Sequence, residues 1–296
     1  MEIRKVQSEE WLSFVENTDN ATFFHTPMWY NLWVNAGYYR GTSAYLFQVE
    51  NEKVLLPLCF KGRKILLRRR YFSSPQGTYG GLVFQNPPQP NFKKEIEKWL
   101  SAKKVKIYKN PYLGENEQNN NCSYIITSNN TITLDSGQNW HPKHRYKLRR
   151  ALKMEFEFHF SNTKNDWQEY YKIYKENIAR RGKTSSNNYS QKLFDELYKL
   201  DESYRRLYLV LKDGAIQGGG IYFFDKTRIY HWHGCFTMQA RELEAPIFLY
   251  YKMMEVLNNS NKQVLDLLPS GGHKGVDLFK RRFWGSDENF KAKQNL

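Results

Sequence analysis

Cysteine is scarce in this chain, and its few copies are far apart. Cys59, Cys122 and Cys235 are the only cysteines among 296 residues, and no two of them form a CxxC pair. Zinc knuckles need closely spaced cysteine pairs, and disulfide frameworks need several cysteines in a short chain. The sequence therefore predicts neither, and we expect no metal site.

Long apolar runs are also missing. Residues 54–60 form the longest apolar stretch near the start, which is far short of the roughly 18–20 residues of a membrane-spanning helix. The first four residues, Met1-Glu2-Ile3-Arg4, lack the basic and then apolar pattern of a signal peptide. We therefore expect a cytoplasmic protein without a transmembrane segment, and peripheral contact with a membrane stays open.

Acidic residues are outnumbered by basic ones. The chain has 45 lysines and arginines against 30 acidic residues, a formal net charge of +15. Such a surplus attracts phosphate groups, whether of nucleic acids, nucleotide-linked substrates or anionic membranes, although much of it can simply be solvated. It is concentrated in residues 61–70 (KGRKILLRRR) and 141–153 (HPKHRYKLRRALK), neither of which contains an acid.

The second basic cluster has helical spacing. Its residues recur at intervals of three and four, and its apolar side is narrow. A helix that is basic over most of its surface faces either water or a polyphosphate. The candidate phosphate ligands on it are Lys147, Arg149 and Arg150.

The remaining sequence indicates two α+β domains. A chain of this length can form two domains of roughly 150 residues each, and its 40% hydrophobic and 16% aromatic content suffices for two cores. Both halves mix helical and antiparallel-strand patterns. We predict domains at residues 1–138 and 139–285.

The C-terminal third is the most informative region. Residues 206–212, 218–224 and 228–235 read as three antiparallel strands. A helix at 246–257, a buried strand at 264–268 and a basic aromatic helix at 276–285 follow. This order recurs in enzymes that transfer an acyl group to an amine.

Several residues of this region are candidates for catalysis. Lys280 lies at the edge of an apolar helical face and could stabilise developing negative charge, although it could also be one more solvated cation. His231 and His233 alternate along a strand and so share one face. Either could deprotonate an acceptor amine, and a zinc site would lack a third ligand. Arg180, Arg181 and Lys183 are further candidate anion ligands. Tyr79, in the glycine-rich loop at residues 73–81, is a candidate substrate ligand.

Six segments, in this order, resemble a known superfamily. The chain is similar over nearly its whole length to the Fem-type peptidoglycan aminoacyltransferases and their acetyltransferase-like relatives in the GNAT superfamily. The segments are residues 24–29 (FHTPMW), 141–153, 179–184 (ARRGKT), Ala245-Pro246, Asp266 and Phe279-Lys280.

The resemblance implies a fold and an activity. It implies two tandem GNAT-like domains with mixed, mostly antiparallel sheets flanked by helices, an acceptor side in the first domain and a donor side in the second. Residues 286–296 would return to the first domain. Trp29 and Lys280 would belong to the site, and the enzyme would transfer an aminoacyl group from aminoacyl-tRNA to an amine of a cell-envelope or peptidoglycan precursor.

The sequence also departs from the family pattern at three positions. Members that use nucleotide-linked muramyl peptides carry a lysine where this chain has Trp33 and an arginine where it has Ser186. A first-domain aspartate of the family is replaced by Asn110. The phosphate clamp and one polar partner of those members are therefore missing here.

The loop before the predicted helix at 246–257 indicates which acyl donor the enzyme would use. CoA-dependent relatives bind pyrophosphate on a glycine-rich loop at that helix start. Residues 234–244 (GCFTMQARELE) have no glycine after Gly234 and carry two glutamates at the helix start. This favours aminoacyl-tRNA, with no cofactor.

Two alternative functions stay open. One is an N-acetyltransferase that uses acetyl-CoA or another acyl-CoA and acts on an amino sugar or other polar amine. The other is a non-catalytic nucleic-acid-binding protein, which is disfavoured because the basic residues lack aromatic interleaving and repeated modules. We expect no DNA partner.

Overall fold

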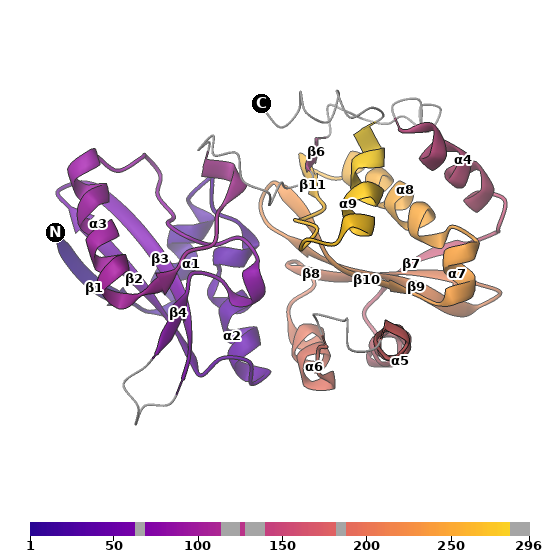
Figure 1. Cartoon of the computed structure of the whole chain (residues 1–296), viewed down its shortest axis with the longest axis horizontal. Coiled ribbons are helices and arrows are strands. Elements are labelled where there is room, and N and C mark those ends of the chain that lie inside the picture. The colour runs from indigo at the N-terminus through magenta and orange to yellow at the C-terminus, as the bar shows by residue number, and fades with distance from the viewer. Residues whose placement is uncertain (63–68, 114–124, 128–139, 182–187, 285–296) are drawn as a thin grey trace. The chain divides into compact units, whose positions relative to one another are not determined.

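The computed structural model describes the chain except for residues 63–68, 114–124, 128–139, 182–187 and 285–296 (Figure 1). The chain divides into two compact units: Met1–Glu115 with Asp195–Leu197, and Asn116–Phe194 with Tyr198–Leu296. The predicted boundary at residues 138 and 139, and the predicted return of residues 286–296, lie outside the described residues.

The first unit is built on a five-stranded sheet in the order β1-β2-β3-β4-β5. Neighbouring strands are antiparallel except β4 and β5, which are parallel. The core includes Phe47, Leu56 and Ile96. The elements are β1 (Glu2–Val6), α1 (Ser8–Glu16), η1 (Phe23–His25), α2 (Pro27–Asn35), β2 (Gly41–Val49), β3 (Glu52–Lys61), β4 (Arg70–Phe72), η3 (Pro75–Gly77), α3 (Pro90–Lys103), β5 (Val105–Lys106) and η4 (Pro111–Leu113).

Local sequence signals account for the helix starts of this unit. Pro27 is the first residue of α2, and the Thr26 hydroxyl accepts a hydrogen bond from the backbone N–H of Trp29. Helix α1 differs: its N-cap is Gln7, whose side chain makes no capping hydrogen bond.

The second unit is built on a six-stranded sheet in the order β6-β11-β10-β9-β8-β7. Only β10 and β11 run parallel. Helices α4, α8 and α9 cover one face of the sheet, and α5 and α6 cover the other (Figure 1). The elements are β6 (Ile125–Thr127), α4 (Pro142–Ala151), β7 (Glu157–Ser161), α5 (Lys164–Arg181), α6 (Gln191–Lys199), β8 (Arg205–Lys212), β9 (Ala215–Phe224), β10 (Arg228–Phe236), α7 (Met238–Glu242), α8 (Ala245–Asn258), β11 (Val264–Asp266), α9 (Lys274–Arg281) and η8 (Arg282–Trp284).

The two units repeat one order of elements. From β1 in the first unit and from β7 in the second, the order is a strand, two helices, three antiparallel strands, one helix (α3) or two (α7 and α8), and a strand parallel to its neighbour. This confirms the α+β prediction. Strand β6 differs from expectation because it pairs with β11 of the second sheet, although its residues fall within the predicted first domain. Pairing with a distant strand leaves no signal in the local sequence.

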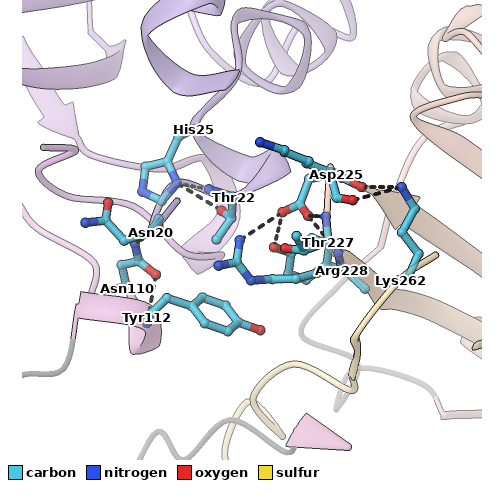
Figure 2. A network of polar contacts seen from close by, with 11 residues as sticks. Asn20, Thr22, His25, Asn110, Tyr112, Asp225, Thr227, Arg228 and Lys262 are labelled. Atoms are coloured by element: carbon cyan, nitrogen blue, oxygen red, sulfur yellow. Dashed lines mark hydrogen bonds and ion pairs between the residues drawn. The ribbon is translucent and has the colours of Figure 1, made fainter. Parts of the chain in front are cut away.

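Asn110, the residue that replaces the family's aspartate, forms a polar network within the first unit (Figure 2). It is 7% exposed. Its Nδ2 donates to the Asn20 carbonyl at 2.7 Å, and its Oδ1 accepts from the Tyr112 backbone N–H at 3.1 Å. The amide therefore serves as donor and acceptor at once, which an ionised carboxylate cannot do.

Restoring aspartate at this position should destabilise the protein. Asn110→Asp would bring a carboxylate oxygen against the Asn20 carbonyl, and we expect a loss of about 1–3 kcal/mol in the free energy of unfolding at pH 7. Urea titration measures it. Asn261→Asp, at an exposed asparagine, is the matched control, and an equal effect of both changes would contradict the prediction.

Candidate active site

The parallel strands β10 and β11 separate part-way along the sheet. They pair at three positions, which end at Tyr230 and Asp266, while β10 continues to Phe236. In the described part of the chain, no strand pairs with this edge of β10 beyond Tyr230. In general, backbone groups along an unpaired strand edge can bind a polar group of a substrate.

At their starts, β10 and β11 are joined by a polar network around Asp225 (Figure 2). Its carboxylate accepts from the backbone N–H groups of Thr227 and Arg228 at 3.0 and 2.8 Å, and lies 3.3 Å from the Arg228 guanidinium. The Lys262 ammonium donates to the Asp225 carbonyl at 2.8 Å. This network joins the starts of both strands, so the separation is confined to their far ends.

The two candidate histidines do not share a face. A bulge interrupts β10 between His231 and His233. His231 Nδ1 lies 2.6 Å from the Tyr250 hydroxyl of α8, whereas His233 Nδ1 lies 2.7 Å from the Tyr170 hydroxyl of α5. Because α8 and α5 cover opposite faces of the sheet, the prediction of a shared face is wrong. The bulge inserts one residue and so reverses the alternation.

His231 is enclosed by glycines and by Tyr250. A Cβ atom at Gly234 or Gly220 would come within 3.0 or 3.1 Å of His231 Nε2, so a side chain at either position would press against the ring. Burial lowers the pKa of His231 to about 3, and the nearby Lys280 charge adds to this effect. A catalytic base needs a pKa near the working pH, so we do not assign His231 as the base.

His233 lies among aromatic rings on the opposite face. The rings of Tyr174, Phe194 and Tyr170 are centred 4.9, 5.7 and 5.7 Å from its own. The sequence did not indicate that Tyr170 would be a hydroxyl partner of His233. The role of His233 as the base stays a prediction.

Lys280 is buried at the separation of the two strands. It is 5% exposed, and its Nζ donates to the carbonyls of Leu267, Leu268 and Pro269 at 2.6, 2.8 and 3.3 Å. These carbonyls directly follow β11, where pairing with β10 has ended. Lys280 was expected at the edge of the apolar face, but it is buried, because its ammonium binds the carbonyls at the end of β11.

The charge of Lys280 is held in a protein interior. Burial lowers the pKa of the Lys280 ammonium to about 8, against the opposing effect of Asp266 and Asp277. Asp266 is fully buried, and its Oδ1 accepts from the Leu268 backbone N–H at 2.7 Å. At pH 7 the site thus contains a cation in a poorly hydrated position, where charge acts strongly.

The basic helix α4 meets the start of α8. Lys147 Nζ lies 2.8 Å from Glu244 Oε2, and Arg150 Nη1 lies 3.7 Å from Glu244 Oε1. Arg149 is exposed. Of the three predicted phosphate ligands, two therefore pair with a glutamate of the chain. The sequence showed that Glu244 lies at the helix start, but not that it contacts α4.

The remaining predicted ligands are scattered. Arg180 is exposed at the end of α5 and donates to Asn177 Oδ1 at 3.1 Å. The Arg181 side chain and Lys183 lie outside the described residues. Trp29 and Tyr79 are buried at 0% and 3% exposure, and Trp29 Nε1 donates to the Thr78 hydroxyl at 3.1 Å. Because both rings are buried, we assign the two residues to packing of the core instead of contact with a substrate.

Comparison with known proteins identifies the family. The model of the family described as acetyltransferase (GNAT) domain matches residues 141–291, which is slightly more than half of the chain. The chain belongs to the GNAT acetyltransferase family. It is therefore an acyltransferase, and the matched range contains α4, the strand separation and Lys280.

Solved structures extend the likeness of this GNAT protein to both units. FemX is 13% identical, with a TM-score of 0.66 over 96% of this chain and 94% of its own. The C-terminal domain of a putative lysylphosphatidylglycerol synthetase from Agrobacterium fabrum is 14% identical, with a TM-score of 0.56 over 97% and 89%. A tandem GNAT protein from the clavulanic acid biosynthesis pathway is 9% identical, with a TM-score of 0.50 over 95% and 94%.

These similarities concern the fold, because the identities are low. They confirm the prediction of two tandem GNAT-like domains. No curated protein matches the sequence. Among the described helices, none combines the length and the hydropathy needed to cross a membrane.

The burial of His144 predicts that acid destabilises this GNAT protein. Its Nε2 lies 2.8 Å from the Phe279 carbonyl, and burial lowers the pKa of His144 to about 4 from 6.5. The unfolded chain therefore takes up a proton at a higher pH than the folded one. We expect the free energy of unfolding to fall by about 2–3 kcal/mol between pH 7.5 and pH 4.5 from this group alone.

Urea titrations over this pH range measure the effect. His144→Gln should flatten the dependence, because glutamine can still donate to the carbonyl but does not titrate. His159→Gln, at an exposed histidine, is the control. The same pH dependence in wild type and His144→Gln would contradict the assignment.

Proposed function

We propose that the protein transfers an aminoacyl group from aminoacyl-tRNA to an amine of a cell-envelope precursor. The observation that carries the proposal is the buried Lys280 ammonium at the point where β10 and β11 separate. The Fem-type resemblance of the sequence supports the donor and acceptor classes, as do the names of the similar structures, FemX and lysylphosphatidylglycerol synthetase.

The transfer joins an amine to an ester carbonyl. The neutral amine attacks the carbonyl carbon, a tetrahedral oxyanion forms, and the C–O bond to the tRNA ribose then breaks. The amide keeps the acyl group, and the proton lost by the amine ends on the ribose hydroxyl. The acceptor must therefore enter as a free amine or lose a proton to a base.

Lys280 would act by its charge on the oxyanion. Negative charge develops on the carbonyl oxygen only during the reaction, so a fixed cation lowers the barrier. Two of its hydrogen bonds, to Leu267 and Leu268, are short. The bond to Pro269 is the longest at 3.3 Å, so its donor is the one most easily redirected to a substrate.

A second function is favoured by the name of the matched family. An acetyltransferase (GNAT) domain and the likeness to a tandem GNAT protein support an acyl-CoA-dependent N-acetyltransferase for a polar amine. The same site chemistry applies, with a thioester in place of the ester and a thiol as leaving group. The alternative therefore differs from the first function chiefly in the donor.

Donor retention separates the two functions. The full chain is incubated separately with radiolabelled acetyl-CoA and with tRNA that carries labelled amino acids, and filter binding measures what it retains. We expect the charged tRNA to be retained and acetyl-CoA to pass through. Retention of acetyl-CoA, followed by acetyl transfer to an amine, would replace the first function by the second.

A further inference from the structure

Glu244 is an anion placed where positive charge converges. It is the N-cap of the 14-residue helix α8, and its side chain is 11% exposed. Lys147 lies 2.8 Å from one carboxylate oxygen, and Arg150 lies 3.7 Å from the other. The two cations come from one helix, α4, and the carboxylate from the start of another.

The backbone shows that Glu244 is held there at some conformational cost. Its φ of 67° lies in the left-handed region, which disfavours residues other than glycine and asparagine. Glycine would be the easier residue at this position, yet a glutamate stands there and binds two cations. The two ion pairs of the carboxylate offset part of the conformational cost.

The arrangement has the chemistry of a phosphate site. The N-terminus of a long helix carries partial positive charge, and a lysine and an arginine beside it strengthen the attraction for an anion. A lysine and an arginine are also the side chains that bind phosphates best. Here the anion belongs to the chain itself, so it competes with any external anion for the same cations.

We infer that Glu244 is a specificity residue that denies this position to the diphosphate group of a donor such as acyl-CoA. The inference rests on the proposed function, because it names the donor class that the site rejects. Specificity of this kind is achieved by an element that repels the wrong ligand as well as by contacts to the right one. The Glu244 carboxylate would repel a diphosphate, and it also neutralises the attraction that Lys147 and Arg150 would exert on one.

The test removes the carboxylate and asks whether a diphosphate then binds. Glu244→Gly suits the left-handed backbone, and Glu244→Gln preserves the size of the side chain. Isothermal titration at low salt with inorganic pyrophosphate and with CoA measures binding to the full chain. We expect wild type to show no saturable binding in the millimolar range, and both variants to bind saturably within that range.

Two controls define the cause. Glu242→Gln removes an exposed glutamate of α7 and the same single charge, and it should behave as wild type. Adding Lys147→Ala and Arg150→Ala to Glu244→Gly should abolish the gain, because these cations would hold the diphosphate. A gain that survives their removal would place the diphosphate elsewhere and overturn the inference.

The remaining outcomes are decisive as well. CoA binding by wild type that equals binding by the variants would overturn the inference. A folded Glu244→Gln, judged by its melting temperature, that gains no binding would overturn it too, even if Glu244→Gly does not fold. Aminoacyl transfer from charged tRNA is measured separately on wild type. Its absence, with the gain of diphosphate binding intact, would remove the proposed function and leave Glu244 as a specificity residue.

Discussion

Replacing Lys280 by methionine should lower turnover by roughly 10²–10³, the usual effect of removing one group that stabilises developing charge. Methionine preserves the length and the packing of the side chain but removes the ammonium. The effect should fall on turnover more than on the Michaelis constant, because the oxyanion exists only during the reaction. Steady-state rates of amide formation measure it.

The same substitution should also reduce stability. It leaves the carbonyls of Leu267, Leu268 and Pro269 without the donor that they have now. Unsatisfied buried groups cost about 1–3 kcal/mol each, and removal of a buried charge offsets part of that cost. We expect a net loss of a few kcal/mol, so rates must be measured well below the melting temperature of the variant.

A pH profile separates the chemical effect of Lys280 from its structural one. The pKa of Lys280 is about 8, and a lysine is charged below its pKa. If the charged form is active, wild-type turnover should fall as the pH rises through about 8. Lys280→Met should lack this fall, which a purely structural role would not remove.

Arg281→Met is the matched control on the same helix. Arg281 Nε lies 2.7 Å from the Asp277 carboxylate, and the two side chains are 41% and 33% exposed. Such surface pairs contribute about 0–1 kcal/mol, so this change should be mild. Equal losses of turnover in the two variants, or an unchanged pH profile in Lys280→Met, would remove Lys280 from the mechanism.

Binding of charged tRNA should weaken steeply with salt. Each phosphate that a basic side chain neutralises contributes a slope of roughly 0.7–0.9 to the fall of log affinity with log salt. Arg149 and Lys143 are exposed on α4, so removing both should lower the slope by roughly 1.4–1.8. Filter binding between about 50 and 200 mM salt, a range over which phosphate contacts lose much of their affinity, measures it.

The ion pair between Arg150 and Glu244 affects which α4 variants should reduce the salt dependence of tRNA binding. Arg149 and Arg150 follow one another in the sequence, but Arg150 faces Glu244. Arg150→Ala should therefore flatten the slope less than Arg149→Ala. Lys192→Ala, at an exposed lysine of α6, is the control. An unchanged slope in the double variant of Arg149 and Lys143 would contradict tRNA binding by α4. Salt-independent binding of acetyl-CoA would contradict aminoacyl-tRNA as the donor.

The order of helices and strands was predictable because its causes are local. Alternating and helical spacings indicated β8, β9 and α8, and Pro27 and Pro246 each lie at a helix start. Similarity in the order of short segments then placed the chain in the GNAT superfamily, which the family match confirms. The position of Lys280 in the family pattern also identified it, from the sequence alone, as a candidate for the site.

Tertiary structure decided where the candidate residues point and what they touch. The bulge in β10 separates His231 from His233, and it depends on pairing with β9. Lys280 is buried because three carbonyls are left at the end of β11, and Glu244 attracts two cations of a helix almost a hundred residues earlier. Periodicity in a sequence reports the exposure of neighbours along the chain, whereas strand register and burial arise from contacts between distant segments, and those contacts select the residues of the site.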